Sequence, residues 1–213
     1  TGRQVDWEYL RDNYKNRDVR GNIVNWNSNY QNNPFFTLYN NLKPQHRDRI
    51  NGFYALSYQM LPWLKVSGRV GTDFYRDARE IRYEKETVDF PNGRYEKLNY
   101  AMNETNSDVL FTANKYFSDN FSVLATVGAA RRDYKYQGIE QVATALVVPG
   151  LFNFSNADGP VQVNEFTNKL RINSVLGSLS LGFYNFIYLD ATARNDWSST
   201  LPAENRSYFY PAF

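Results

Sequence analysis

The chain has 213 residues, 42% of them hydrophobic, which is enough for one large domain or two small ones. Its 24 basic and 22 acidic residues leave a net charge of +2, so no excess of charge indicates a nucleic-acid partner. The absence of cysteine excludes disulfide scaffolds, thiol catalysis and cysteine metal sites.

The first half of the chain changes from irregular sequence to clear strand patterns. Up to residue 44 it is rich in Asn and charge without a sustained period, so we expect loops or short irregular strands. From Ile50 to Met60 apolar residues alternate with period two, which predicts a strand. A turn at Leu61-Pro62 leads into the clearest strand, residues 64–75, whose apolar face holds Leu64, Val66, Gly68, Val70, Thr72 and Phe74.

Two further pairs of segments repeat this pattern. Residues 108–117 and 121–136 meet at the turn Ser118-Asp119-Asn120, and residues 166–182 and 186–194 meet at Tyr184-Asn185. Helical spacing is nowhere convincing. The predicted fold class is therefore all-β and antiparallel.

The predicted connections alternate strictly between short and long. Short turns follow Met60, Phe117 and Gly182, whereas residues 83–97, 136–164 and 195–207 form long connections. One end of the sheet therefore carries only turns and the other carries loops. This asymmetry is typical of outer-membrane barrels, whose short turns are periplasmic and whose long loops are extracellular.

Strand length and aromatic content also favour a transmembrane β-barrel segment over a soluble sandwich. Residues 63–75 keep their alternation beyond the usual five or six residues of soluble strands, close to the roughly nine to eleven that cross a bilayer. Lys65, Arg69 and Asp73 would then line the interior. In a sandwich, the turn-side aromatics would be ordinary core residues; in a barrel they would form an interfacial girdle of Trp63, Phe117, Phe121, Phe183, Tyr184 and Phe186.

Few residues suit catalysis or metal binding. His46 is the one histidine, and its sequence "KPQHRDR" indicates a solvent-facing side chain. Asp73, Asp77 and Glu80 alternate with Arg and Lys, which is typical of solvated ion pairs. No metal-site spacing or phosphate-binding loop is present, and the best apolar run is broken by Pro149 and Gly150. We expect no enzyme activity, no cofactor and no spanning helix.

The stretch "YLDATARNDWSSTLPAENRSYFYP", Tyr188 to Pro211, closely resembles a signature near the middle of the barrel in SusC/RagA-type TonB-dependent outer-membrane transporters. Gly2 to Trp7, Asn33 to Asn41 and Arg47 to Tyr75 are similar to other parts of that family. The resemblance covers nearly the whole chain. The stretch from Tyr188 to Pro211 is the most specific of the four.

For the signature residues the resemblance and the residue chemistry together predict structural roles. Arg194 would end a strand at the outer rim, Asn195 and Asp196 would form a turn, and Trp197 would cover it. Hydroxyl groups of the loop would bind its backbone, and three aromatics would re-enter the membrane interface. The residues assigned to this signature are Arg194, Asn195, Asp196, Trp197, Ser198, Ser199, Asn205, Arg206, Tyr208, Phe209, Tyr210 and Pro211.

The resemblance implies active import across the outer membrane of a Gram-negative bacterium. Such a barrel has about twenty-two strands in contact with membrane lipid and encloses an N-terminal plug. Its partners are a SusD-like surface lipoprotein, the TonB-ExbB-ExbD complex and an oligosaccharide or peptide substrate. The sequence contains no signal peptide, TonB box or plug, so we expect residues 1–213 to be part of the barrel domain of a longer chain.

Two other functions are compatible with the sequence. A soluble β-rich glycan-binding module would use Phe152, Phe154 and Trp26 to stack on sugar rings, and a passive porin would need neither plug nor lipoprotein. In the transporter, the loop from Gln137 to Asn164 is the best candidate for contacts with the substrate or the lipoprotein. The sequence nominates no individual substrate-binding residue.

Overall fold

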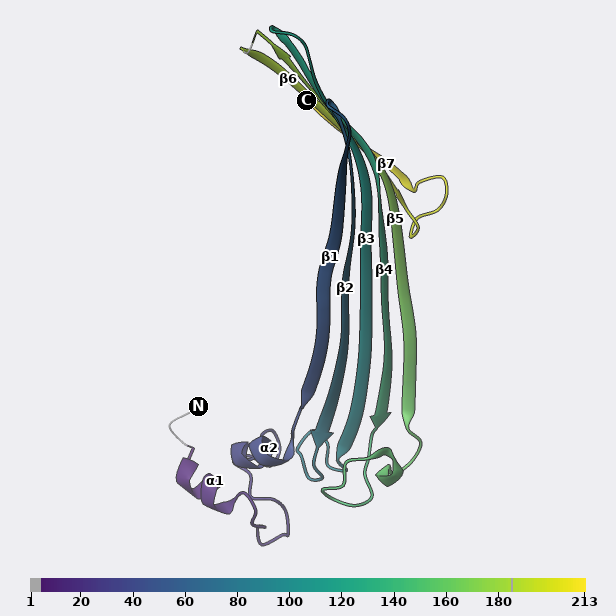
Figure 1. Cartoon of the computed structure of the whole chain (residues 1–213). Helices are drawn as coiled ribbons and strands as arrows, with labels where there is room; N and C mark the ends of the chain where they lie inside the picture. The colour runs from purple at the N-terminus through teal and green to yellow at the C-terminus, as the bar shows by residue number, and fades with distance from the viewer. Residues whose placement is uncertain (1–4, 185) are drawn as a thin grey trace. The chain divides into compact units, whose positions relative to one another are not determined.

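Seven strands form one antiparallel sheet in chain order in the computed structural model, which describes residues 5–184 and 186–213 (Figure 1). The predicted all-β, antiparallel fold class is confirmed. Within the described residues β1 and β7 are the edges of the sheet. The strands are β1 (Gln45–Leu61), β2 (Leu64–Tyr83), β3 (Arg94–Ser118), β4 (Phe121–Ala143), β5 (Gln162–Phe183), β6 (Ile187–Ser198) and β7 (Ser207–Ala212).

Two short helices precede the sheet, where the sequence predicted only loops or irregular strands. These are α1 (Trp7–Asn13) and α2 (Pro34–Asn40), and the prediction was wrong because two turns are too short to show a helical period. Local capping explains them: the Asp6 carboxylate accepts a hydrogen bond from the Tyr9 backbone at 2.9 Å, and Asn33 caps α2 before Pro34. Among the described residues, no helix has the length and apolar character needed to span a membrane.

The predicted alternation of short and long connections is confirmed. Pro62-Trp63 joins β1 to β2, and Asp119-Asn120 joins β3 to β4. The third predicted turn, Tyr184-Asn185, lies between β5 and β6, but Asn185 is outside the described residues. The long connections are residues 84–93, 144–161 and 199–206.

The long connections are shorter than predicted because the strands extend into them. Residues 137–143 belong to β4 and residues 162–164 to β5, so the predicted loop from Gln137 to Asn164 is reduced to 144–161. Residues 195–198 likewise belong to β6. The backbones of these residues pair with a neighbouring strand.

The contacts divide the chain into two compact units. The first unit comprises the chain up to Asp48, Arg76–Tyr100 and Gly138–Phe166. The second unit comprises Arg49–Tyr75, Ala101–Gln137 and Thr167–Phe213. Strands β1 to β5 contribute residues to both units, whereas β6 and β7 belong to the second.

In the first unit, Asn33 holds α1 to the segment before α2. Its side chain is 0% exposed, and its amide donates to the carbonyl oxygens of Leu10 at 2.8 Å and Val24 at 3.0 Å. A buried amide needs such partners, because an unsatisfied polar group costs about 1–3 kcal/mol. The helices are therefore positioned by hydrogen bonds as well as by apolar contact.

The loop of residues 144–161 has its own small core. Leu146, which is 0% exposed, packs with Tyr95 and Ala143, and the half-buried rings of Phe152 and Phe154 lie against this cluster. The Phe154 and Tyr95 ring centroids are 5.0 Å apart. The loop is thus ordered by burial of apolar side chains at the ends of β3 and β4.

We predict that Leu146→Ala loosens this loop. Removing a fully buried leucine costs about 2–5 kcal/mol through lost burial and the cavity left behind. Amide hydrogen exchange in residues 144–161 should accelerate. The matched control is Leu151→Ala in the same loop, where the side chain is 46% exposed and exchange should be unchanged. Equal protection in both variants would contradict the loop core.

Gly128 of β4 leaves no room for a side chain. A Cβ atom there would overlap the Leu110 side chain and the Val109 carbonyl oxygen of β3. At Gly68 of β2, by contrast, the nearest atom to an added Cβ is the Asp108 carbonyl oxygen, 3.7 Å away, which is ordinary van der Waals contact. The sheet therefore requires glycine at the first position and tolerates a methyl group at the second.

Gly128→Ala should lower the free energy of unfolding by about 1–3 kcal/mol through overpacking. Gly68→Ala should change it by less than about 0.5 kcal/mol. Urea unfolding followed by tryptophan fluorescence measures both values. If the two variants unfolded at the same urea concentration, the close approach at Gly128 would be disproved.

Candidate functional site

One face of the second unit is held together by polar contacts across neighbouring strands. Arg49 of β1 donates to Asp73 of β2 at 2.8 and 2.5 Å, and Arg69 of β2 donates to Asp108 of β3 at 2.9 Å. The hydroxyl groups of Thr112 and Thr126 are 3.3 Å apart across β3 and β4. We call this side the polar face. It carries Lys65, Arg69 and Asp73, the three residues predicted to line an interior.

The opposite face of the second unit, the apolar face, carries most of its exposed large apolar side chains. Side chains alternate along a strand, so residues one position away from the polar contacts point to this other side. Tyr54 and Leu56 are 87% and 83% exposed. Other exposed members of the apolar face are Ile50, Tyr58, Met60, Val70, Val109, Phe111, Val127, Val175, Leu179, Leu189 and Phe209.

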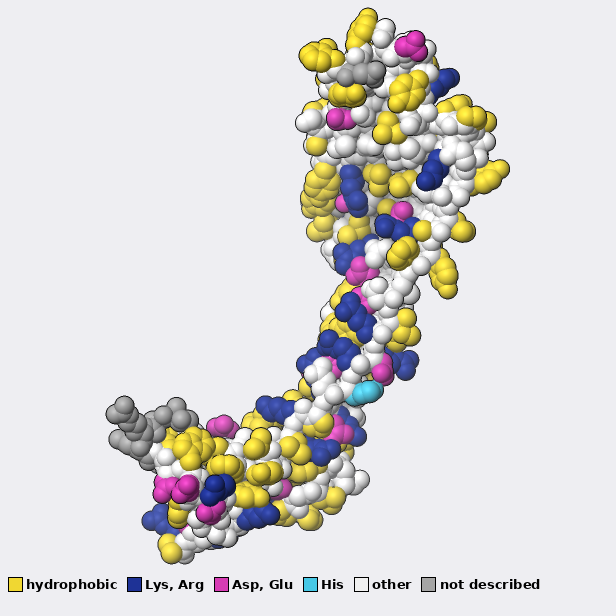
Figure 2. All heavy atoms as spheres, turned by 60° about the vertical axis from the view of Figure 1, so that its left-hand side comes forward, with side chains coloured by type: hydrophobic (Ala, Val, Ile, Leu, Met, Phe, Trp, Pro, Cys, Tyr) yellow, Lys and Arg dark blue, Asp and Glu magenta, His cyan; other side chains and the backbone are white. Residues whose placement is uncertain are grey.

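The second unit has no hydrophobic core of its own within the described residues. The buried hydrophobic residues of the described chain are Leu10, Ile23, Phe36, Tyr95, Ala143 and Leu146, all of which belong to the first unit. Hydrophobic side chains instead stand at the surface of the strands (Figure 2). A contiguous apolar surface of this kind marks contact with a membrane or with another protein.

Aromatic rings gather at the turn ends of the second unit. Phe121 lies between Phe117 and Phe183, with ring centroids at 5.8 and 5.0 Å. The ammonium group of Lys115 lies over both Trp63, at 5.7 Å, and Phe117, at 5.0 Å. The structure thus links four of the six predicted girdle residues. Tyr184 and Phe186 lie in the third turn and are exposed.

The three carboxylates considered for catalysis are all engaged by basic groups. Asp77 is buried and accepts hydrogen bonds from Gln45, Arg47 and Arg79. Glu80 pairs with Arg82 at 2.5 Å and with Lys97 at 3.7 Å, and Asp73 pairs with Arg49 at 2.5 Å. Asp73 and Glu80 form the predicted ion pairs, whereas Asp77 is not solvated as predicted, because three donors replace water around it.

His46 is exposed as predicted, with its Nε2 atom 3.2 Å from the Asp48 carboxylate. Across the part of the chain that the structure describes, no three His, Cys, Asp or Glu residues gather in a group able to hold a metal ion. Asp73, Asp77 and Glu80 thus pair with basic residues at neighbouring positions of the sheet.

Arg194 lies inside β6 instead of ending it. It donates to the Ser174 hydroxyl at 2.9 Å and to Asp196 at 2.7 Å. Asn195 and Asp196 pair with Phe209 and Tyr208 of β7, so the prediction that they form a turn was wrong. The backbone N–H and C=O groups of Asn195 and Asp196 are satisfied by pairing with β7, whereas in a turn side chains would have to satisfy them.

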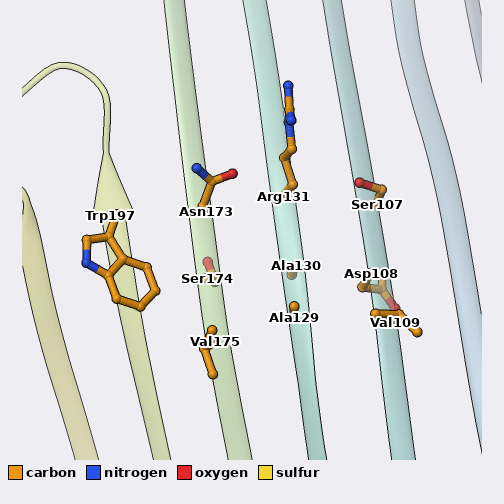
Figure 3. Close-up of a pocket in the computed structure, with 10 residues that line it drawn as sticks. All are labelled: Ser107, Asp108, Val109, Ala129, Ala130, Arg131, Asn173, Ser174, Val175 and Trp197. Atoms are coloured by element: carbon orange, nitrogen blue, oxygen red, sulfur yellow. The ribbon is translucent and has the colours of Figure 1, made fainter.

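Trp197 lines a shallow pocket of the apolar face, and the turn at Asn195 and Asp196 that it was predicted to cover does not form. The pocket has a volume of about 360 Å³, and Trp197 lines it from β6 (Figure 3). Asn173 and Val175 of β5 line it next to Trp197, and Ala129 lines it from β4, on the other side of β5 (Figure 3).

The signature loop is fastened to its neighbouring strands by hydrogen bonds. The Ser199 hydroxyl accepts from the Arg171 backbone at 2.8 Å, and the Ser199 backbone donates to the Arg171 carbonyl at 2.8 Å. The Ser198 backbone donates to the Arg206 carbonyl at 3.0 Å, and Asn205 donates to Pro202 at 3.0 Å. The predicted binding of loop backbone by a loop hydroxyl is confirmed for Ser198, which accepts a hydrogen bond from the Thr200 backbone at 3.4 Å, whereas the Ser199 hydroxyl binds the backbone of β5.

The chain after the signature loop forms β7. Tyr208 and Tyr210 pair with Asp196 and Arg194, and Pro211 pairs with Ala193. Phe209, between the two tyrosines in the sequence, points to the apolar face, and the tyrosines point to the polar face. The predicted return as a strand is confirmed.

Two of the three aromatics of the glycan-binding alternative belong to the loop core. Phe152 and Phe154 pack on Tyr95 inside the loop core, and the Arg82 guanidinium lies 5.9 Å from the Phe152 ring. Trp26 lies in the segment between α1 and α2. The phenylalanine rings therefore serve loop packing first.

The sequence analysis missed a group of charged residues on the apolar face. Arg131, Asp133 and Lys135 continue the alternation of β4 beyond Val127 and Ala129, and Lys169 and Arg171 do so on β5. The sequence of β4 does show that every second residue changes from apolar to charged after Ala129. It does not show that β4 pairs with β5, and this pairing brings the charged residues of the two strands together.

Solved structures resemble this chain, although no protein-family model and no curated protein matches it. A structure of the RagAB peptide transporter superposes with a TM-score of 0.74 at 15% identity, covering 91% of this chain and 23% of that chain. The RagAB peptide importer gives TM-scores of 0.73 in its "closed-closed" state and 0.68 in its "open-open" state, both at 17% identity. The chain therefore spans less than a quarter of the solved chains, and it has the fold of that part of them.

Proposed function

We propose that residues 1–213 form part of the barrel wall of a SusC/RagA-type TonB-dependent transporter in the outer membrane of a Gram-negative bacterium. The plug domain and the remaining strands belong to other parts of the longer chain. The function is import, and the chain itself carries no catalytic role.

The observation that carries this proposal is the exposed apolar face of a unit without a hydrophobic core. On β2 the apolar positions run from Leu64 to Phe74, a stretch of the roughly nine to eleven residues that a tilted strand needs to cross a bilayer. Lipid would cover the apolar face, and the polar face would line the interior. The structural likeness to the RagAB chains supports the same assignment.

The connections give the orientation in the membrane. The rings of Trp63, Phe117, Phe121 and Phe183 would lie at the periplasmic interface, where amphipathic aromatics are enriched. The long connections would then be extracellular. The loop of residues 144–161, with its own packed core, is the candidate surface for the substrate or for a capping lipoprotein.

The partners follow from the family assignment. We infer a SusD-like lipoprotein at the extracellular mouth and energy supplied by the TonB-ExbB-ExbD complex through the plug. The substrate would be an oligosaccharide or a peptide, and the names of the similar structures, a peptide transporter and importer, favour the peptide.

A soluble module is the weaker alternative because of the same apolar face. A soluble sandwich buries one face of each sheet against the other, which places large apolar residues in a core. Tyr54 and Leu56 are instead exposed, and two of the three rings assigned to sugar stacking, those of Phe152 and Phe154, are engaged in loop packing.

The proposal predicts opposite outcomes for neighbouring residues of β1. Leu56→Arg places a charge on the apolar face, where lipid contact would cost about 2–4 kcal/mol near the bilayer centre. Ser57→Arg places the same charge on the polar face and should be tolerated. In the full-length protein, the fraction that runs as a heat-modifiable band from outer-membrane extracts should fall only for Leu56→Arg.

The contrary result is equally clear. If the wild-type protein were soluble without detergent and showed no heat-modifiable band, the membrane assignment would be overturned. Equal loss of the band in both variants would show that the two faces of β1 do not meet different surroundings.

A further inference from the structure

A basic groove lies on the apolar face of the second unit, where the apolar residues of β4 and β5 give way to charge. Its volume is about 420 Å³. Lys135, Lys169 and Arg171 line it together with the polar residues Asn103, Thr105 and Ser199. Arg131 lies two residues before Asp133 on the same face of β4.

One carboxylate arranges two of the basic groups. Asp133 binds Arg131 through one oxygen and Arg171 of the neighbouring strand through the other, each at 2.6 Å. Its single negative charge is shared between two guanidinium groups. Two guanidinium groups thus share one carboxylate, and Lys135 and Lys169 add further positive charge to the groove, which leaves it with a positive excess.

Lys135 and Lys169 supply the positive charge of the groove that can bind an external anion. Both Lys135 and Lys169 are exposed, and neither takes part in an ion pair within the described residues. A lysine ammonium group that lacks an internal partner is free to bind an external anion. The flexible stem also lets it reach a phosphate outside the groove.

The groove continues directly from an apolar surface. Along β4 the same face carries Val127, Ala129, Arg131 and then Lys135, so the change from apolar to basic occurs within about 7 Å between Ala129 and Arg131. Figure 3 shows the boundary: Arg131 extends away from Ala129, and the Trp197 indole lies at the same level on β6. A tryptophan at such a boundary is typical of the membrane interface.

We propose that this basic groove binds the phosphate group of an anionic lipid, a phosphorylated glycolipid of the outer leaflet, whose acyl chains lie on the adjoining apolar face. The inference rests on the proposed function, because that function places this end of the apolar face at the outer leaflet. Arginine forks bind phosphate oxygens in pairs, and the lysines add point charges. The occupant must be amphiphilic because the surface is apolar on one side of the Arg131 boundary and basic on the other.

The test titrates the purified full-length protein, in non-ionic detergent, with monophosphoryl lipid A and with the same lipid after removal of its phosphate. Native mass spectrometry measures the bound fraction. Lys135→Gln and Lys169→Gln should each weaken binding of the phosphorylated lipid about fivefold, the effect of about 1 kcal/mol per basic residue near an anionic surface. The phosphate-free lipid should bind more weakly to the wild type and equally to all variants.

Lys65→Gln is the matched control, because Lys65 is an exposed lysine on the polar face of the same unit. It should leave lipid binding unchanged. The inference is overturned if Lys65→Gln weakens binding as much as the groove variants do, or if the groove variants have no effect. Equal binding of phosphorylated and phosphate-free lipid would also overturn it. Displacement of the lipid by millimolar inorganic phosphate would reveal a simple anion site and would exclude the lipid.

Heat-modifiable migration of the same samples separates this inference from the proposed function. An intact barrel with no effect of the groove variants contradicts only the lipid site. A protein without a heat-modifiable band contradicts the transporter proposal, and the lipid site falls with it.

Discussion

The constraint on which the rest of the structure depends is the two-faced chemistry of strands that have no core to pack against. In the second unit, backbone hydrogen bonds join each strand to the next, while large apolar side chains such as Tyr54 and Leu56 stay exposed. Burying apolar surface is the main driving force for folding, so this unit needs a covering that the described chain does not supply. Under the proposed function a bilayer would provide it without a second layer of protein, because only alternate residues have to be apolar.

The polar side chains specify the register of the strands more than they stabilise the fold. Exposed ion pairs such as Arg49 with Asp73 and Arg69 with Asp108 are worth no more than about 1 kcal/mol each. A shift of one residue, however, would exchange the faces and place these charges among the apolar residues. The same ion pairs therefore fix which face is which, and a side chain at Gly128 would overlap β3.

Much of the sheet was predictable from the sequence because successive side chains of a strand point to opposite faces, so apolar residues recur at every second position. The strand at 64–75, the turns near Pro62 and Asp119, and the alternation of short and long connections follow from local patterns. The sequence could not predict α1 and α2, which depend on caps over two turns. It also missed the extension of β6 to Ser198, since Asn195 and Asp196 have turn chemistry but find partners in β7. The Asp133 contacts that shape the basic groove were hidden because they join strands through the register.

The central claim is that lipid covers the apolar face of the sheet. Fluorescence quenching of labels on the two faces of β1 tests it most directly, because it shows whether each face meets lipid or water. The chain contains no cysteine, so single substitutions place a fluorescent label at one position at a time. Labels at Tyr54→Cys, Leu56→Cys and Tyr58→Cys in the reconstituted full-length protein should be quenched by a bilayer-soluble quencher. Labels at Ala55→Cys, Ser57→Cys and Gln59→Cys should be quenched by a water-soluble one. Quenching without this two-residue alternation, with all six labels equally open to water, would contradict a sheet whose apolar face is covered by lipid.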